Sequence, residues 1–429
     1  MKFYSTRNKE EFVTFKEAIF RGLAPDGGLY MPEIMPDMKS LIDLFTPETT
    51  FNEIAASITE QLLSEELDSA ACKRICDRAF TFTPELTDLK NGISILELYH
   101  GPSCAFKDFG ASFLASCMEE FLSNESREAT ILTATSGDTG SAVARAFYGK
   151  KNINVVILYP SGRVSPLQEK QLTTLGGNIR ALEVKGAFDD CQRMVKEAFL
   201  DKEMSEKLKL TSANSISLGR LIPQSFYYIW AWAQMKGNRE NLTFCVPSGN
   251  FGNLTAGIMA NQWGMGNTSF IAATNINDVV PEYIKSGTFN PRASKLTLSN
   301  AMDVGNPSNF ERMLDIFNDS HDKMSELLKE EVVTDSETKK TIKKLLDEKD
   351  YEADPHTAVG YLAAERRLKD TNGPIVSLST AHPGKFTEVY EEATGKKPAL
   401  PEQLKAVLNL EKKSTIVGNT LDDMKAVLL

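Results

Sequence analysis

Two glycine-rich loops are the first candidates for ligand binding in this sequence. Residues 135–140 read TSGDTG and residues 247–253 read PSGNFGN, and each loop lies between an apolar run and a helical pattern. Glycine allows sharp backbone turns and close approach of a ligand. The helix that follows presents free N–H groups and the positive end of its dipole, which attract phosphate or carboxylate. For either loop alone, a turn without a ligand remains the alternative, because neither contains the lysine of a Walker A motif.

Lys107 is the candidate nucleophile. It lies in the run HGPSCAFKDFG (residues 100–110), next to Phe106 and near Phe109. A lysine held among apolar side chains has a lowered pKa, and its neutral amine can act as a base or form a Schiff base with an aldehyde. Together with the two loops, Lys107 indicates pyridoxal phosphate and an amino-acid substrate. The cofactor needs a lysine and a phosphate site, and the substrate carboxylate needs the second loop.

Seven short apolar runs predict the strands that position these loops. They span residues 93–99, 129–135, 154–159, 179–185, 243–246, 270–274 and 375–379, and helical patterns such as 141–148 and 188–200 separate most of them. Apolar strands that alternate with helices predict an α/β protein with parallel sheets covered on both faces. Residues 51–80 show helical periodicity, and the densely charged residues 321–350 are expected to form a solvated helical surface.

The composition argues against several functional classes. The 429 residues are 41% hydrophobic and 25% charged, with a net charge of −10, which is typical of a globular protein and disfavours nucleic-acid binding. No apolar run is long enough for a transmembrane helix, and the first residues lack a signal-peptide pattern. The six cysteines form no dense framework, and none pairs with a histidine at zinc spacing. A cytoplasmic protein with no bound metal, membrane contact or nucleic-acid partner is therefore expected.

Six long runs resemble the threonine synthase family, in the long form found in many bacteria and fungi. They are HGPSCAFKDFG, LTATSGDTGSAVARAFYG, VVILYPSGRVSPLQEKQLTTLGGNI, PSGNFGNLTAG, TLSNAMDVGNPSN and STAHPGKF, and the similarity extends over the whole chain. The resemblance implies a fold type II pyridoxal-phosphate enzyme, similar to tryptophan synthase β, with two open parallel-sheet domains. It also implies the conversion of O-phospho-L-homoserine and water to L-threonine and phosphate.

The resemblance implies a domain organisation as well. Residues 1–95 are expected to form an added helical or mixed element. Residues 96–125 and 205–429 are expected to form the larger cofactor-binding domain with a C-terminal extension, and residues 126–204 the smaller α/β domain. The family's long form also suggests a monomer.

The resemblance assigns roles to residues of the cofactor site. Lys107 matches the lysine that binds the cofactor, and Thr380 matches the position that faces the pyridine nitrogen. Asp138 stands where many relatives have an asparagine that contacts the ring hydroxyl. The cofactor phosphate is expected on the loop of Ser248, Gly249, Asn250, Phe251, Gly252 and Asn253.

A second set of residues is implied for the substrate. Its members are Ser136, Gly137 and Thr139 for the carboxylate, Asn214, Ser215 and Arg220 for the phosphate, and Ser103 for either anion. Arg220 suits this role because a guanidinium binds phosphate through two parallel hydrogen bonds. Arg163 and Lys170 are weaker candidates for the same pocket. His100 and His382 are expected to make structural hydrogen bonds.

Two other functions stay open at this stage. A phospho-lyase similar to threonine synthase would release 2-oxobutyrate, ammonia and phosphate from the same substrate, and analysis of the products separates the two enzymes. A non-catalytic binding protein that retains the fold would lack the absorbance of the cofactor.

Overall fold

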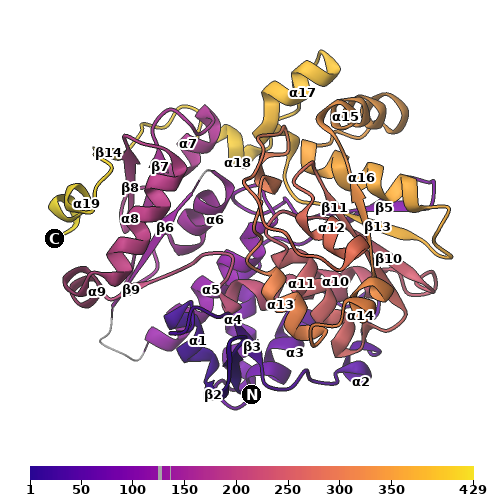
Figure 1. Cartoon of the computed structure of the whole chain (residues 1–429), viewed down its shortest axis with the longest axis horizontal. Coiled ribbons are helices and arrows are strands. Elements are labelled where there is room, and N and C mark those ends of the chain that lie inside the picture. The colour runs from indigo at the N-terminus through magenta and orange to yellow at the C-terminus, as the bar shows by residue number, and fades with distance from the viewer. Residues whose placement is uncertain (124–127, 136) are drawn as a thin grey trace.

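Two parallel β-sheets occupy the two halves of the molecule, and the N-terminal elements pack at its lower edge in Figure 1. The computed structural model describes residues 1–123, 128–135 and 137–429. Helices cover the sheets, as the apolar character of the central strands requires. No helix in these described residues is both long and apolar enough to cross a lipid bilayer.

The larger sheet has six strands in the order β12-β11-β10-β13-β5-β4, and all neighbouring strands are parallel except β4 and β5. The strands are β4 Glu85–Asp88, β5 Ile93–Glu97, β10 Leu242–Pro247, β11 Thr268–Thr274, β12 Leu328–Val332 and β13 Ile375–Ser379. The helices that follow or cover them are α5 Lys107–Leu122, α10 Leu218–Gln234, α11 Gly252–Ala260, α12 Val279–Ser286, α13 Phe310–Ile316, α14 His321–Leu327, α15 Asp335–Lys349, α16 Pro355–Arg367 and α17 Thr387–Thr394.

The smaller sheet has five parallel strands in the order β14-β8-β7-β6-β9. The strands are β6 Ala129–Ala134, β7 Ile153–Pro160, β8 Ile179–Val184, β9 Leu210–Thr211 and β14 Ser414–Val417. The helices of this half are α6 Asp138–Phe147, α7 Pro166–Thr173, α8 Phe188–Leu200, α9 Lys202–Leu208 and α19 Leu421–Leu428, and the short α18 Glu402–Lys405 precedes β14.

The N-terminal element combines a small antiparallel sheet with four helices. Its parts are β1 Phe3–Ser5, β2 Asn8–Val13, β3 Tyr30–Pro32, α1 Phe15–Arg21, α2 Lys39–Ile42, α3 Phe51–Leu63 and α4 Ser69–Ala79. Phe51 and Phe80 pack against Phe109 of α5, with ring centroids 5.3 and 6.0 Å apart. Because α5 begins at Lys107, this aromatic contact fixes the helix that presents the candidate lysine.

The loops expected to bind ligands emerge at the carboxyl ends of the strands. β6 ends at Ala134 and is followed by α6, β10 ends at Pro247 and leads into α11, and β13 ends at Ser379. Ligands of open α/β sheets bind at this edge. The fold therefore brings loops from both sheets toward one site.

All seven strands predicted from apolar runs are present as β5, β6, β7, β8, β10, β11 and β13, and the two helical patterns named above form α6 and α8. The expectation for residues 321–350 was wrong in part, because residues 328–332 form the edge strand β12 between α14 and α15. Its alternating buried and exposed residues suit a strand at the rim of a sheet.

The structure also differs from the expected division of the chain at two places. The C-terminal strand β14 pairs with β8, and α19 contacts α8, so residues 414–428 join the smaller sheet rather than extend the larger domain. Figure 1 shows this yellow segment beside the smaller sheet. At the other boundary, β4 and β5 begin before residue 96 and belong to the larger sheet.

Candidate active site

Lys107 lies at the start of α5, where β5 and β13 end. The N–H of Phe106 donates to the carbonyl of Thr380 over 2.9 Å, and Ala105 forms an isolated β-bridge with Ala381. These two contacts fix the backbone of the two residues that precede the lysine. The Lys107 side chain is only 18% exposed, and its Nζ lies 5.9 Å from the centre of the Phe106 ring.

The surroundings of Lys107 favour a neutral amine. Burial lowers the pKa of Lys107, the nearby cations Lys385 and Arg220 lower it further, and the Asp138 carboxylate opposes them. Burial is the largest cause because water can no longer stabilise the ammonium form. A lysine with a lowered pKa can attack an aldehyde or accept a proton near neutral pH.

The loop after β10 forms the opposite wall of the cavity. The Ser248 hydroxyl donates to Asn253 Oδ1 over 2.7 Å, and Asn253 Nδ2 donates to the Pro247 carbonyl over 3.0 Å, which closes the loop on itself. Phe251 takes the left-handed conformation, with φ of 59°, just before α11. Among the described residues, the N–H groups of residues 249–253 have no hydrogen-bond partner, so they are available to an anion. Five such donors at a helix N-terminus suit a phosphate.

Gly249 is required by close packing. A Cβ atom added there would lie 2.6 Å from the carbonyl oxygen of Ala301 and 2.7 Å from Cα of Met302. The turn at residues 300–302 is in turn held by His356, whose Nε2 accepts the N–H of Ala301 over 3.2 Å. The loop and this turn therefore form one packed wall.

Arg220 supplies a cation to the same cavity. Its side chain is buried, its Nη1 donates to the Ala213 carbonyl over 2.7 Å, and its Nε has no partner among the described residues. Burial lowers the pKa of Arg220 to about 10, and it remains charged at neutral pH. A buried donor without a partner indicates that an anion completes this site.

Asp138 is a buried carboxylate at the first turn of α6. Its Oδ1 accepts from Lys385 Nζ over 2.7 Å and from Gln168 Nε2 over 3.0 Å, whereas its Oδ2 lies 3.7 Å from Lys107 Nζ. Burial alone would raise the pKa of Asp138, but the charge and the hydrogen bond of Lys385 hold it well below its ordinary value. Asp138 is therefore an anion in the folded protein.

We call the space between these groups the inner cavity. Its walls include Phe106, Lys107, Thr139, Ser215, Arg220, Gln224, Gly249, Asn250, Phe251, Gly252, Asn253, Ala301, Met302, His356 and Thr380. A neutral amine at one wall and a row of free N–H groups at the other fit a cofactor that has both an aldehyde and a phosphate. These features fit pyridoxal phosphate.

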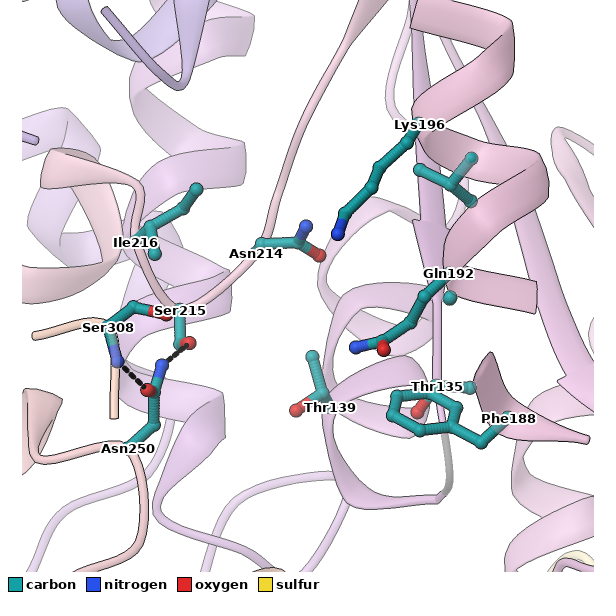
Figure 2. Close-up of a pocket in the computed structure, with 12 residues that line it drawn as sticks. Thr135, Thr139, Phe188, Gln192, Lys196, Asn214, Ser215, Ile216, Asn250 and Ser308 are labelled. Carbon is teal, nitrogen blue, oxygen red and sulfur yellow. Dashed lines mark hydrogen bonds between the residues drawn. The ribbon is translucent and has the colours of Figure 1, made fainter. Parts of the chain in front are cut away.

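A second space, the outer pocket, shares Thr139, Ser215 and Asn250 with the inner cavity. Its other walls are Ala134, Thr135, Phe188, Gln192, Val195, Lys196, Asn214, Ile216 and Ser308. Figure 2 shows the Lys196 and Gln192 side chains extending from α8 toward the segment of Asn214 and Ser215. The pocket has a volume of about 370 Å³, which is enough for a small polar substrate.

Three family models cover nearly the whole chain. The model for the threonine synthase N terminus matches residues 2–80, the model for pyridoxal-phosphate dependent enzymes residues 83–380, and the model for the threonine synthase C-terminal region residues 357–428. Threonine synthase of Haemophilus influenzae is 44% identical over the full length of both chains. The chain belongs to the threonine synthase family. Pyridoxal phosphate is therefore its cofactor, as the inner cavity indicated.

Solved structures of the family agree with this assignment. Threonine synthase from Escherichia coli superposes with a TM-score of 0.90 at 40% identity and covers 100% of this chain and 99% of its own. The structure of threonine synthase from Brucella melitensis with bound pyridoxal phosphate gives a TM-score of 0.92 at 33% identity, with 99% and 98% covered. The fold expected from the sequence, a fold type II enzyme with an added N-terminal element, is confirmed.

Most of the site residues predicted for this family come together around the two spaces. The inner cavity collects Lys107, Thr380, Arg220 and the loop 249–253, while Ser248 is buried behind that loop. Asn214 lines the outer pocket, where its Oδ1 accepts from the Thr133 hydroxyl over 2.9 Å. The predicted Ser136 lies outside the described residues. Gly137 has φ of 149°, where a Cβ would lie 2.8 Å from the Gln168 side chain.

Ser103 is buried away from both spaces. Its N–H donates to Asp108 over 2.9 Å, and its carbonyl accepts from Lys385 and from Gln171. Neither Arg163 nor Lys170 is among the described residues that line the two spaces, and the Lys170 ammonium donates to the carbonyl of Leu410.

The histidines make the structural contacts expected from the sequence. His100 Nε2 lies 3.0 Å from Glu97 Oε2, and this hydrogen bond raises the pKa of His100. His382 Nδ1 accepts the N–H of Gly384 over 3.0 Å at the start of a short 3₁₀ turn, Pro383–Phe386.

Four polar residues at the site had no role in the sequence analysis: Lys385, Gln168, His356 and Lys196. Lys385 lies within the run STAHPGKF, but a lysine after glycine has no local sign of burial. Lys196 and Gln192 are four residues apart in α8 and therefore lie on the same face of the helix. This spacing is the only feature of the sequence that could have grouped them.

Proposed function

We propose that this chain converts O-phospho-L-homoserine and water to L-threonine and phosphate. The observation that carries the proposal is that the two spaces adjoin, since Thr139, Ser215 and Asn250 line both of them. The inner cavity contains Lys107 and the free N–H groups of residues 249–253, and the outer pocket is lined by Lys196, Asn214 and Ser215. This arrangement supports a substrate that presents an amine near the cofactor and a phosphate farther out.

The residues that would hold the cofactor come from three loops. We assign Lys107 to the aldehyde, the N–H groups of residues 249–253 to the phosphate, and the Thr380 hydroxyl to the ring nitrogen. Pyridoxal phosphate, when bound, withdraws electrons from the substrate and so makes its Cα and Cβ protons acidic. A threonine hydroxyl cannot stabilise a positive ring nitrogen as a carboxylate would, so Thr380 supports a neutral ring.

The Lys107 amine is the group that we propose moves protons. With its pKa lowered by burial, Lys107 Nζ can accept a proton from the substrate and later return one. Asp138 is paired with Lys385 and its pKa is held well below the ordinary value, so its carboxylate does not compete with Lys107 as a base.

The substrate anions are proposed to bind on both sides of Thr139, which lines both spaces. The carboxylate is assigned to Gly137, which directly precedes α6, and to Thr139 in the first turn of α6. The phosphate is assigned to Asn214, Ser215 and Lys196, and we keep Arg220, which lines the inner cavity together with Ser215, as a further phosphate ligand.

A turnover assay with O-phospho-L-homoserine tests the proposal. Threonine, phosphate, 2-oxobutyrate and ammonia are measured in the same sample, with Lys107→Ala as the control. The proposal expects threonine and phosphate in equal amounts. Equal amounts of phosphate and 2-oxobutyrate would identify a phospho-lyase instead, and no release of phosphate would reject this substrate.

We also propose a cytoplasmic monomer. The six cysteines, which all lie in described segments, are free and buried, which suits a reducing compartment. Light scattering on the purified protein tests the oligomeric state, because a mass near twice 47.5 kDa would contradict the monomer.

A further inference from the structure

Lys385 faces the same carboxylate as Lys107, that of Asp138, and its side chain is fully buried. It belongs to the short turn after β13 in the larger half, whereas its partner Asp138 begins α6 in the smaller half. Lys385 Nζ lies 2.7 Å from Asp138 Oδ1 and also donates to the Ser103 carbonyl over 2.7 Å. This ion pair therefore connects the two halves of the molecule directly beside Lys107.

The distances show which of the two lysines Asp138 binds more closely. The contact with Lys385 is a hydrogen-bonded ion pair, whereas Lys107 Nζ lies 3.7 Å from the other carboxylate oxygen, beyond hydrogen-bond reach. One buried carboxylate thus stands between two lysines and is bound closely by only one of them. A buried ammonium without such a partner would be strongly unfavourable.

We propose that Lys385 is a positioning residue that engages Asp138 and so leaves the nitrogen of Lys107 without a close anionic partner. The inference goes beyond the proposed reaction but rests on Lys107 as the cofactor lysine. The physical basis is that a nearby anion stabilises a protonated nitrogen. The anion nearest to Lys107 is Asp138, and Lys385 already neutralises it. The lowered pKa of Lys107 agrees with this arrangement.

Other ionisable groups face the same region of the site. Arg220 on α10 lowers the pKa of Lys107, and His356 on α16 contributes to the low pKa of Asp138. Asp108, the neighbour of Lys107 on α5, is buried, and burial raises its pKa to about 6. Of these groups, only Lys385 is in hydrogen-bond contact with the Asp138 carboxylate.

The test is a pH titration of the visible absorbance of the holoenzyme, which reports protonation of the lysine nitrogen bound to the cofactor. Lys385→Met leaves Asp138 to act on that nitrogen alone, so the midpoint is expected to rise by roughly one pH unit or more. Asp138→Asn removes the anion and leaves Lys385 charged, so the midpoint is expected to fall. The double variant removes both charges and is expected to return the midpoint toward that of the wild type.

Gln168→Met is the matched control. Gln168 donates to the same carboxylate oxygen over 3.0 Å but has no charge, so its loss should leave the midpoint nearly unchanged. A midpoint that stays unchanged in Lys385→Met, or that shifts equally in Gln168→Met, would overturn the inference. If Lys385→Met does not fold, the Asp138→Asn variant tests the inference by itself. A titration midpoint that is unchanged or raised in Asp138→Asn would also overturn the inference.

The assignment of Lys107 is checked separately. The visible absorbance must be present in the wild type and absent in Lys107→Ala. If that result holds while the midpoints do not move, Lys385 has no such role and the proposed function stands. If the absorbance survives in Lys107→Ala, the proposed function itself fails.

Discussion

The side-chain amide of Asn250 donates a 2.7 Å hydrogen bond to the hydroxyl of Ser215 and so joins the loop after β10 to the segment before α10. The oxygen of the same amide accepts the N–H of Ser308 over 2.6 Å. Figure 2 shows both bonds at the edge of the outer pocket. Asn250 thus holds three segments together where the proposed cofactor and substrate sites meet.

Asn250→Ala is expected to loosen this junction. The lost hydrogen bonds should raise KM for the substrate about tenfold, the factor that corresponds to about 1.4 kcal/mol, with a smaller loss of cofactor affinity. Ser308→Ala is the matched control, because the bond to Asn250 uses the main-chain N–H of Ser308 and survives the change. Equal kinetics for the two variants would contradict this role of Asn250.

Lys107→Ala should remove both the visible absorbance and the activity. Loss of a proton carrier at the reacting atoms is expected to reduce kcat by at least roughly 100-fold. Steady-state kinetics and an absorbance spectrum of the purified protein measure the two effects. Lys170→Ala is the control, since Lys170 donates to the carbonyl of Leu410 and lies outside both spaces. Retained turnover in Lys107→Ala would show that another group moves the proton.

Lys196→Met should weaken binding of the substrate phosphate. Lys196 is exposed on α8, makes no ion pair with the residues that the structure describes, and extends toward Asn214 in Figure 2. Loss of a charged hydrogen-bond donor to phosphate is expected to raise KM by roughly 10- to 100-fold and to leave kcat nearly unchanged. Lys207→Met, which removes an exposed lysine paired with Glu203 on α9, serves as the control.

A parallel measurement uses inorganic phosphate as a competitive inhibitor. Its inhibition constant should rise in Lys196→Met by a factor similar to that for KM, and it should depend more weakly on salt than in the wild type. If kcat fell while KM and phosphate inhibition stayed constant, Lys196 would act in a later step rather than in binding.

Local patterns in the sequence were sufficient to predict much of this fold. The apolar runs predicted seven strands because buried parallel strands need nearly continuous apolar residues, as β7 shows with seven of its eight residues buried. The two glycine-rich loops could also be predicted from the local sequence. Close packing at Gly249 and the backbone angle at Gly137 both depend on the residue itself.

The features that the sequence did not reveal depend on distant partners. Lys385 is buried because Asp138, from the other half of the molecule, neutralises it, and the short run PGKF contains no sign of that contact. β14 joins the smaller sheet because the C-terminal segment returns to β8, and a strand of four residues is too short to predict its neighbour. Asp138 itself was identified, but its role required the distances to both lysines.

His382 predicts a dependence of stability on pH. Its Nδ1 accepts the N–H of Gly384, and burial lowers its pKa to about 4. In the unfolded chain the pKa of histidine is about 6.5. As pH falls from 6.5 to 4, the unfolded state therefore binds a proton that the folded state excludes. The free energy of unfolding must decrease over this range and become level below it.

His382→Asn separates this titration from the hydrogen bond, because an asparagine oxygen can accept the same N–H but binds no proton in this range. Between pH 7.5 and pH 5, the wild type should lose about 2 kcal/mol of unfolding free energy more than the variant. Urea unfolding at the two pH values, followed by circular dichroism, measures the difference. The same decline in both proteins would mean that His382 is protonated in the folded state, and that burial does not lower its pKa as proposed.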